Sequence, residues 1–173
     1  GKKAGEFYTP PEVSLLLTKL LQPQPGNRIG DPACGSGSLL IKMGQAVPAN
    51  TKGERDVSLY GMEANGATWA LCKMNMFLHG FDQARVEWRD TLRSPVFTDP
   101  ATGGLATFDC VIANPPFSLE QWGREIWEND PWGRSFAGLP TDSNADFAWV
   151  QHMVKSMAEK SGRMAVVLPQ GTL

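Results

Sequence analysis

The sequence predicts one α/β domain built on an open, largely parallel β-sheet with helices on both faces. Short apolar and β-branched segments alternate with longer amphipathic segments along the 173 residues, which is the pattern of consecutive β-α-β units. Most of the predicted strands end at a polar or acidic residue, as strands that lead into a ligand site do. A hydrophobic content of 42% fits a single domain, residues 1–173, that buries its own core.

Residues 1–25 are predicted to carry an N-terminal helix. Thr9 is the expected N-cap, Pro10 takes the first helical position, and Glu12 completes a capping box. Apolar residues at helical spacing define its predicted core-facing side, namely Val13, Leu16, Leu17, Leu20 and Leu21.

Two predicted β-α units follow this helix. A strand led by Ile29 ends at Asp31, and a second strand at 57–62 ends at Glu63. The helix after the first strand contains Leu39, Leu40, Ile41 and Met43. Asn65 is the predicted cap of the helix after the second strand, whose buried face is predicted as Ala67, Ala70, Leu71, Met74 and Leu78.

Three more strands and a long irregular loop are predicted in the second half of the chain, and the middle one of these strands contains Val111, Ile112 and Ala113 and runs into Asn114. A strand at 85–88 leads to Asp90, and residues 118–143 have no clear periodicity, although they contain Trp122, Trp127 and Trp132. We expect these tryptophans to cover the core or to face another domain. A last helix is predicted from Asn144 to the Ser-Gly stop at 161–162, with Phe147, Val150, Val154 and Met157 on its buried side. A fifth strand is predicted at 164–168.

Charge and cysteine usage narrow the possible classes of protein. A net charge of −2 gives no global basic field for a polyanion. Cys34, Cys72 and Cys110 lack metal-ligand spacing, so we expect reduced, buried thiols in a cytoplasmic protein, and no metal site. The sequence contains no apolar run long enough to span a membrane. Because the chain opens at Gly1 and stops just after an apolar strand, we expect it to be part of a longer protein.

Four side chains follow predicted strands directly, and these are Asp31, Glu63, Asp90 and Asn114. Because the carboxyl ends of parallel strands meet at one edge of an open sheet, we expect them to share a site. The Gly35-Ser36-Gly37 turn lets a ligand approach the backbone, although no P-loop lysine follows it. Tight strand–helix packing and solvated surface acids are the alternative interpretations of these glycines and acids.

The charges of this set indicate the kind of ligand. Asp31 beside the glycine turn would repel a phosphate and attract a cation. Glu63 is placed to accept both hydroxyls of a ribose, and Asp90 to accept from an adenine amino group. The set therefore describes a pocket for an adenine, a ribose and a positively charged tail without phosphate, which is the make-up of S-adenosylmethionine.

The turn Asn114-Pro115-Pro116-Phe117 is the second candidate site. Its two prolines fix φ twice, so an amide side chain, a proline carbonyl and an aromatic ring follow one another in a rigid order. That order suits a planar amine, with acceptors at one edge and a ring against its face. A plain strand-ending turn is the alternative.

These motifs resemble the amino-group DNA methyltransferases, and most closely the modification subunit of type I restriction-modification systems. The resemblance rests on Asp31-Pro32-Ala33-Cys34-Gly35-Ser36-Gly37-Ser38 followed by Asn114-Pro115-Pro116-Phe117, with Glu6-Phe7-Tyr8-Thr9-Pro10 ahead of both. It implies a Rossmann-like methyltransferase fold, truncated at the C-terminus to five of the usual seven strands. It also implies S-adenosylmethionine as cofactor, bound by Phe7, Tyr8, Thr9, Asp31, Ala33, Gly35, Ser36, Gly37, Ser38, Glu63, Asp90 and Asn114.

The resemblance further implies methyl transfer to adenine N6 in double-stranded DNA, with the adenine flipped out of the helix. The implied catalytic residues are Asn114, Pro115, Pro116 and Phe117. Asn114 and the Pro115 carbonyl would accept the amino hydrogens, and Phe117 would stack on the base. The implied partners are a specificity subunit, a second modification subunit and a restriction subunit.

Two other readings of the chain stay open. One alternative to the DNA methyltransferase prediction is a cofactor-binding module without activity by itself. The other is an amino-group methyltransferase that acts on protein glutamine or RNA. Outside the site, His79 is expected to end its helix, His152 to face solvent, and Cys34 to pack as a small residue.

Overall fold

A computed structural model describes residues 8–172, so the predicted cofactor contact of Phe7 lies outside the described residues. Its centre is a five-stranded sheet in the order β3-β2-β1-β4-β5, with every pairing parallel. The strands span β1 Asn27–Asp31, β2 Val57–Glu63, β3 Arg85–Trp88, β4 Cys110–Ala113 and β5 Arg163–Val166. The predicted parallel α/β architecture is confirmed.

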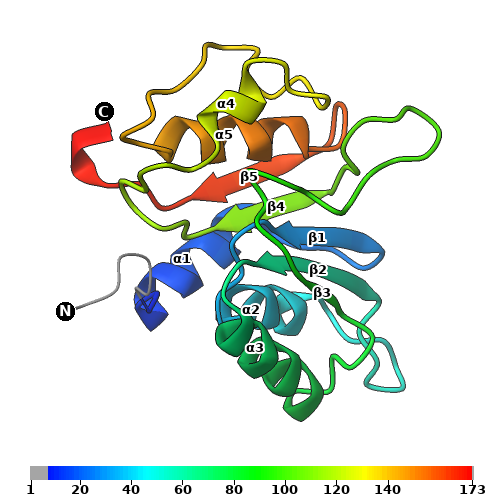
Figure 1. The fold of residues 1–173 in the computed structure, drawn as a ribbon. Coiled ribbons are helices and arrows are strands. Elements are labelled where there is room, and N and C mark those ends of the chain that lie inside the picture. Colours follow the sequence, from blue (N-terminus) through cyan, green and yellow to red (C-terminus); the bar gives the residue numbers. More distant parts are fainter. Residues whose placement is uncertain (1–7, 173) are drawn as a thin grey trace.

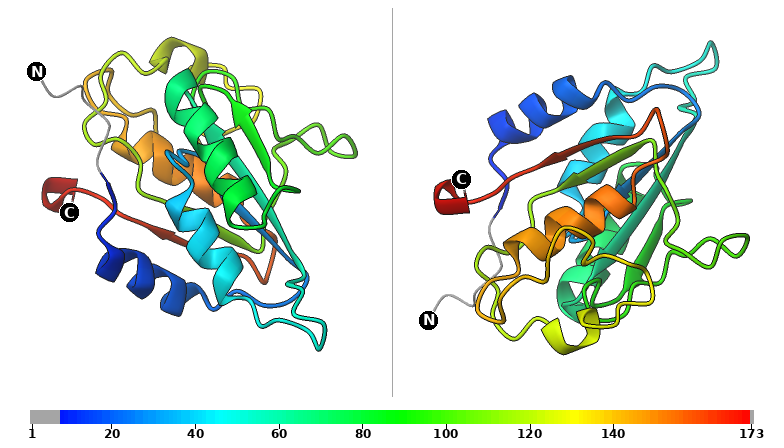
Figure 2. Two further views of the ribbon diagram at one scale, coloured as in Figure 1. Left: turned by 90° about the horizontal axis from the view of Figure 1, so that it is seen from below. Right: turned by 90° about the horizontal axis from the view of Figure 1, so that it is seen from above.

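Helices cover both faces of this sheet, as expected (Figure 1). One face carries α1 Pro11–Leu21, α2 Ser38–Ala46 and α3 Gly66–Leu78, and the other carries the short α4 Arg124–Trp127 and α5 Asp146–Lys155. Both views of Figure 2 place α1 beside β5, where Arg163 Nε donates to the Leu21 carbonyl at 2.9 Å. The chain order reverses between β1 and β4, and this switch point is where open parallel sheets bind ligands.

Strand register brings the predicted polar strand ends to one edge of the sheet. Asp31 pairs with Gly61 of β2, two residues before Glu63, and Gly30 pairs with Val111, three residues before Asn114. The strands between them are apolar and covered on both faces, as in β4, whose four residues are all buried.

The predicted buried faces of three helices are wrong in part. On α1, Leu17 and Leu21 are buried, but Leu16 and Leu20 are 56% and 64% exposed. On α3 the buried residues are Cys72 and Met76, while all five predicted residues are exposed, namely Ala67, Ala70, Leu71, Met74 and Leu78. On α5 the buried side includes Trp149, His152 and Met153 rather than Phe147 and Val154. Each helix has apolar residues on two sides, so periodicity alone could not select the side that meets the sheet.

Helix ends also differ from the prediction at two places. α1 starts at Pro11 with Pro10 at the N-cap and no side-chain cap, so Thr9 does not cap it. α5 starts at Asp146 and ends at Lys155, well before the predicted Ser-Gly stop. The cap by Asn65 is confirmed, because its side chain accepts from the Thr68 N–H. His79 is the C-cap residue of α3, as expected.

The segment 118–143 contains α4 and otherwise irregular chain, but it has a core of its own. Trp122 and Trp127 are 2% and 0% exposed and meet edge to face. They join Leu92, Ala145, Ala148 and Trp149 in one apolar cluster. The expectation that these two tryptophans cover the core is confirmed, whereas Trp132 is only partly buried.

Candidate functional site

A cleft of about 600 Å³ opens at the carboxyl ends of the strands, within the usual range for small-molecule sites. Most of the predicted site residues in the described chain line it. They are Tyr8, Thr9, Asp31, Ala33, Gly35, Ser36, Ser38, Glu63, Asp90, Asn114 and Pro116. Three predicted site residues do not line the cleft, namely Gly37, Pro115 and Phe117.

The two glycines of the turn between β1 and α2, Gly35 and Gly37, have different surroundings and different structural roles. Gly35 has φ +54°, and a Cβ placed on it would meet nothing within 4 Å, so this backbone faces open space in the cleft. Gly37 has φ +87°, and a Cβ there would lie 2.7 Å from Cys72 Sγ, so this glycine lets α3 pack against the turn. The sequence expectation of close ligand approach therefore fits Gly35, and the packing alternative fits Gly37.

Asp31 is the buried acid of the cleft, with 3% of its surface exposed. Burial raises the pKa of its carboxyl to about 8; the Ala33 N–H bond lowers that pKa, and the nearby charge of Glu63 raises it. The cleft thus contains an acid that lacks a cation among the described side chains. A positively charged group beside it would favour its ionised form, which is the property expected of a site for a cationic cofactor.

Glu63 connects the end of β2 to the glycine turn. Its Oε1 accepts from the Gly35 N–H at 3.2 Å, and its Oε2 accepts from the Asn65 N–H at 2.6 Å. Each carboxylate oxygen can accept a further hydrogen bond, so these two bonds orient the carboxylate and leave acceptor positions for a ligand. Glu63 lines the cleft and remains available to accept from a diol.

Asp90 lies at the solvent edge of the same cleft. Its carboxylate is 3.6 Å from Arg93 Nε, with both side chains substantially exposed. The next residue, Thr91, is buried and donates its hydroxyl to the Pro32 carbonyl, which connects this segment to the glycine turn. Asp90 therefore sits on a segment that is held to the floor of the cleft.

Asn114 ends β4 with one half of its amide engaged and the other half free. Its Nδ2 donates to Thr9 Oγ1 at 2.9 Å. Its Oδ1 is buried and has no hydrogen-bond partner among residues 8–172. A buried acceptor without a donor costs about 1–3 kcal/mol, so this oxygen is prepared for an incoming N–H or O–H group.

Sequence reasoning missed the remaining residues of the cleft wall, which are Pro32, Cys34, Leu39, Ala64, Asn65, Thr68, Leu71, Arg89, Thr91, Leu119 and Trp149. Those directly beside the strand-end acids could have been found by including the neighbours of each acid. Trp149 could not, since it comes from α5 on the other face of the sheet. Trp149 is 5% exposed, and its Nε1 also lacks a partner in the described part of the chain.

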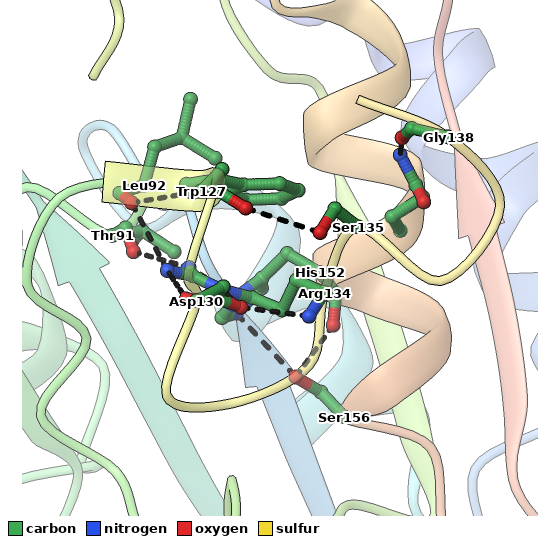
Figure 3. Close-up of polar contacts among 10 residues, drawn as sticks. Thr91, Leu92, Trp127, Asp130, Arg134, Ser135, Gly138, His152 and Ser156 are labelled. Atoms are coloured by element: carbon green, nitrogen blue, oxygen red, sulfur yellow. Dashed lines mark hydrogen bonds and ion pairs between the residues drawn. The ribbon is translucent and has the colours of Figure 1, made fainter. Parts of the chain in front are cut away.

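Behind the cleft, a buried arginine holds the segment that follows β3 (Figure 3). Arg134 is fully buried and pairs with Asp130 at 2.9 Å. Its Nη1 and Nη2 donate to the Thr91 and Leu92 carbonyls at 2.9 and 3.1 Å. The guanidinium carbon lies 4.4 Å from the centre of the Trp127 ring. Loop 118–143 thereby supports the backbone beside Asp90.

His152 belongs to this cluster, and the prediction that it faces solvent is wrong. It is 3% exposed, and its Nδ1 lies 3.3 Å from Arg134 Nη1. Burial, and next the positive charge of Arg134, lower the pKa of His152 to about 3. A neutral imidazole is therefore packed between α5 and the loop, where periodicity had suggested a polar surface.

The three cysteines are buried and unpaired, in agreement with the prediction. Cys34 and Cys72 are in contact with their sulfur atoms 3.9 Å apart. That contact, followed by burial, raises the pKa of Cys34 well above its ordinary value. A thiol of this kind is a weak nucleophile, so Cys34 packs beneath the turn as expected.

Comparison with known proteins agrees with this geometry. The model of the N-6 DNA methylase family matches residues 1–173. The chain belongs to that family. It is 33% identical over 174 residues to the methylase subunit of the type I restriction enzyme HindI from Haemophilus influenzae. The alignment covers 100% of this chain and 37% of that subunit.

Solved structures are similar over the whole of this methylase-family chain. The type I restriction-modification methyltransferase subunit from Streptococcus thermophilus matches with a TM-score of 0.83 and 34% identity, over 100% of this chain and 36% of that one. An S-adenosylmethionine-dependent O-methyltransferase from Thermotoga maritima matches with a TM-score of 0.62 at 15% identity, over 96% of this chain and 47% of that one, and so shares the fold. The chain spans about a third of the length of its type I relatives.

Neither a metal-ligand cluster nor a membrane-spanning helix occurs in residues 8–172. No group of three or more His, Cys, Asp or Glu side chains in that range could hold a metal ion. None of its helices has the length and apolar character needed to cross a membrane.

Proposed function

We propose that this chain is the catalytic part of the modification subunit of a type I restriction-modification system. This subunit would be a DNA adenine-N6 methyltransferase that uses S-adenosylmethionine. One observation supports this most directly. Asn114, whose buried Oδ1 has no hydrogen-bond partner in the described chain, lines the same cleft as the buried acid Asp31. An acceptor for an amino group and an anionic site for a cationic methyl donor are the two requirements of this reaction.

The residues of the cleft fit the cofactor. Asp31 would lie near the cationic end, the open backbone at Gly35 would admit a close approach, and Glu63 would accept from the ribose hydroxyls. Asp90 would accept from the adenine amino group, and Tyr8, Thr9, Ala33, Ser36 and Ser38 would complete the wall. When bound, S-adenosylmethionine supplies an electrophilic methyl group on a positively charged sulfur.

Asn114 and its neighbours would hold the acceptor amine. The Asn114 Oδ1 and the Pro115 carbonyl would accept hydrogen bonds from the two N–H groups of the amine. These two bonds would direct the nitrogen lone pair toward the methyl group. Phe117 would stack on a base flipped out of double-stranded DNA. In an in-line transfer the carbon–sulfur bond would break as the carbon–nitrogen bond forms, the demethylated cofactor would leave as a neutral thioether, and the methylated nitrogen would then lose its extra proton to solvent. Positioning and electrostatics supply most of the catalysis of such a transfer, and no side chain acts as a general base before the transition state.

The partners are part of the same proposal. With a net charge of −2, this part of the protein would rely on a specificity subunit to read DNA, joined by a second modification subunit and a restriction subunit. A cytoplasmic location remains a prediction from cysteine usage.

Two alternatives are kept because the chain spans about a third of its relatives. A cofactor-binding module without activity by itself would bind S-adenosylmethionine but transfer no methyl group. A methyltransferase for RNA or protein glutamine would have the same cofactor-binding and amine-binding residues but a different acceptor amine.

The test uses the full-length protein with its specificity subunit. Labelled S-adenosylmethionine is supplied with DNA from a strain that lacks the system, and with RNA or protein in parallel reactions. We expect label in adenine N6 of the DNA alone. Asn114→Ala should lower the rate at least about 100-fold, because the acceptor for the amine is lost. A wild-type rate for Asn114→Ala would contradict the catalytic assignment.

A further inference from the structure

The hydrogen bond between Thr9 and Asn114 joins two segments that are 105 residues apart in the chain. Thr9 lies just before α1, is 7% exposed, and lines the cleft. Asn114 ends β4 on the opposite side of the switch point from β2 and β3. Contact between their side chains connects the predicted cofactor segment directly to the predicted catalytic turn.

The Thr9 hydroxyl is not used to begin the helix. The N-cap of α1 is Pro10, and no side chain caps this helix. The first-turn backbone bonds are made without it, as in the Ser14 N–H to Pro10 carbonyl bond of 3.0 Å. The described contact of Thr9 Oγ1 is with Asn114 Nδ2 at 2.9 Å.

This bond determines which end of the Asn114 amide faces the acceptor. An asparagine amide has a donor end and an acceptor end, and a 180° rotation exchanges them. With Nδ2 engaged by Thr9, the free end is Oδ1, which has no partner in the described chain. In the reverse orientation, Nδ2 would meet the hydrogens of the amine, and the amine would lose its acceptor.

We infer that Thr9 is a positioning residue for the methyl transfer, which holds the Asn114 amide with Oδ1 toward the acceptor amine. The inference rests on the proposed function and adds a role to a residue predicted only as a cofactor contact. Thr9 thereby connects the cofactor half of the cleft to the amine half.

The chain provides a matched control for substitutions of Thr9. Thr18 is also a threonine with 7% exposure, and its hydroxyl bonds to the Ser14 carbonyl within α1 at 2.8 Å. It does not line the cleft. Thr9→Val and Thr18→Val therefore remove the same buried oxygen from nearby positions, and only the first removes the partner of Asn114.

The experiment measures cofactor affinity and transfer rate separately in the full-length protein with its specificity subunit. Calorimetry gives the Kd for S-adenosylmethionine, and single-turnover transfer to DNA at saturating cofactor gives the rate. For Thr9→Val we expect a rate about 10- to 100-fold lower, because a misplaced reacting group costs about that much. We expect the Kd to change by less than about threefold, which is under 1 kcal/mol. Thr9→Ser and Thr18→Val should retain the wild-type rate.

Three results would overturn the inference. These are a wild-type rate for Thr9→Val at saturating cofactor, a Thr18→Val variant as slow as Thr9→Val, or a Thr9→Ser variant as slow as Thr9→Val. Melting temperatures show whether each variant folds, and Thr9→Ala replaces Thr9→Val if the valine variant does not. If the wild-type protein transfers no methyl group to DNA, the proposed function itself is wrong, which is a separate outcome.

Discussion

At the scale of single residues, burial separates three acids that look equivalent at the strand ends. Asp31 is buried with one N–H bond, Glu63 accepts from two backbone N–H groups, and Asp90 is an exposed partner of Arg93. Burial raises the pKa of Asp31 to about 8. A ligand cation beside Asp31 therefore favours the ionised form of this acid.

Cofactor binding should consequently depend on pH through Asp31. In the free protein this acid is protonated below about pH 8, and a cation prefers its ionised form. We expect the affinity for S-adenosylmethionine to fall as pH is lowered from 8 to 6, by at most about tenfold per unit. Calorimetric titration at several pH values measures this.

Asp31→Asn is the control for that titration. The amide has a similar shape but no charge to gain, so its affinity should be weak and nearly independent of pH. The titration of the cofactor itself is common to both proteins and cancels in the comparison. Equal pH slopes for the wild type and Asp31→Asn would show that Asp31 is not the responsible group.

At the scale of elements, the turn between β1 and α2 matches its two glycines to two surroundings. Gly35 is next to the empty part of the cleft, and Gly37 is next to Cys72 and Met76 of α3. Both have positive φ, so both prefer glycine. They differ in what a side chain would displace, a ligand at Gly35 and a helix at Gly37.

Alanine substitutions should separate these two roles. Gly37→Ala adds a clash with Cys72 to the backbone strain, and we expect a loss of about 3 kcal/mol of unfolding free energy. Gly35→Ala should lower the free energy of unfolding by about 1 kcal/mol from backbone strain alone. It should also lower the affinity for S-adenosylmethionine at least about tenfold, since its Cβ enters the cleft. Thermal unfolding and calorimetry measure the two effects, and the same ranking of both variants in both measurements would contradict this division.

At the scale of the whole molecule, the loop 118–143 is a packed part of the domain. Arg134 and Trp127 both contact the Leu92 carbonyl, and His152 of α5 lies beside Arg134 (Figure 3). Together they fill the space between the sheet and the loop and hold the segment that contains Asp90. The edge of the cleft at Asp90 therefore depends on a polar cluster whose members Asp130, Arg134 and His152 do not line the cleft.

His152 gives this cluster a dependence on pH. Its pKa is about 3 in the folded protein and about 6.5 in an unfolded chain. Between these values the unfolded chain binds a proton that the fold excludes, so stability falls as pH falls below about 6.5. We expect the wild type to lose about 2 kcal/mol between pH 6.5 and 5 relative to His152→Gln, which has no such proton. Denaturant unfolding of both proteins at the two pH values checks this, and parallel losses would refute it.

Much of the fold and of the cofactor edge was predictable because it follows from local sequence and general rules of chain topology. Apolar runs predicted the five strands, and β-α-β connections make neighbouring strands parallel, so the carboxyl ends of these strands had to lie at one edge of the sheet. Asp31, Glu63 and Asn114 come together for that reason alone. The side of each helix that meets the sheet was not predictable, since it depends on how competing apolar stripes pack.

The sequence by itself determined the order of strands and helices, the family, and the residues that end each strand. Only the tertiary structure decided that Thr9 bonds to Asn114, that Arg134 and His152 are buried together, and that Gly37 meets α3. Each of these contacts joins residues distant in the chain, and no local pattern encodes a distant partner. Burial then set the properties of the same groups, because removing water changes the pKa of an acid or an imidazole far more than neighbours in sequence do.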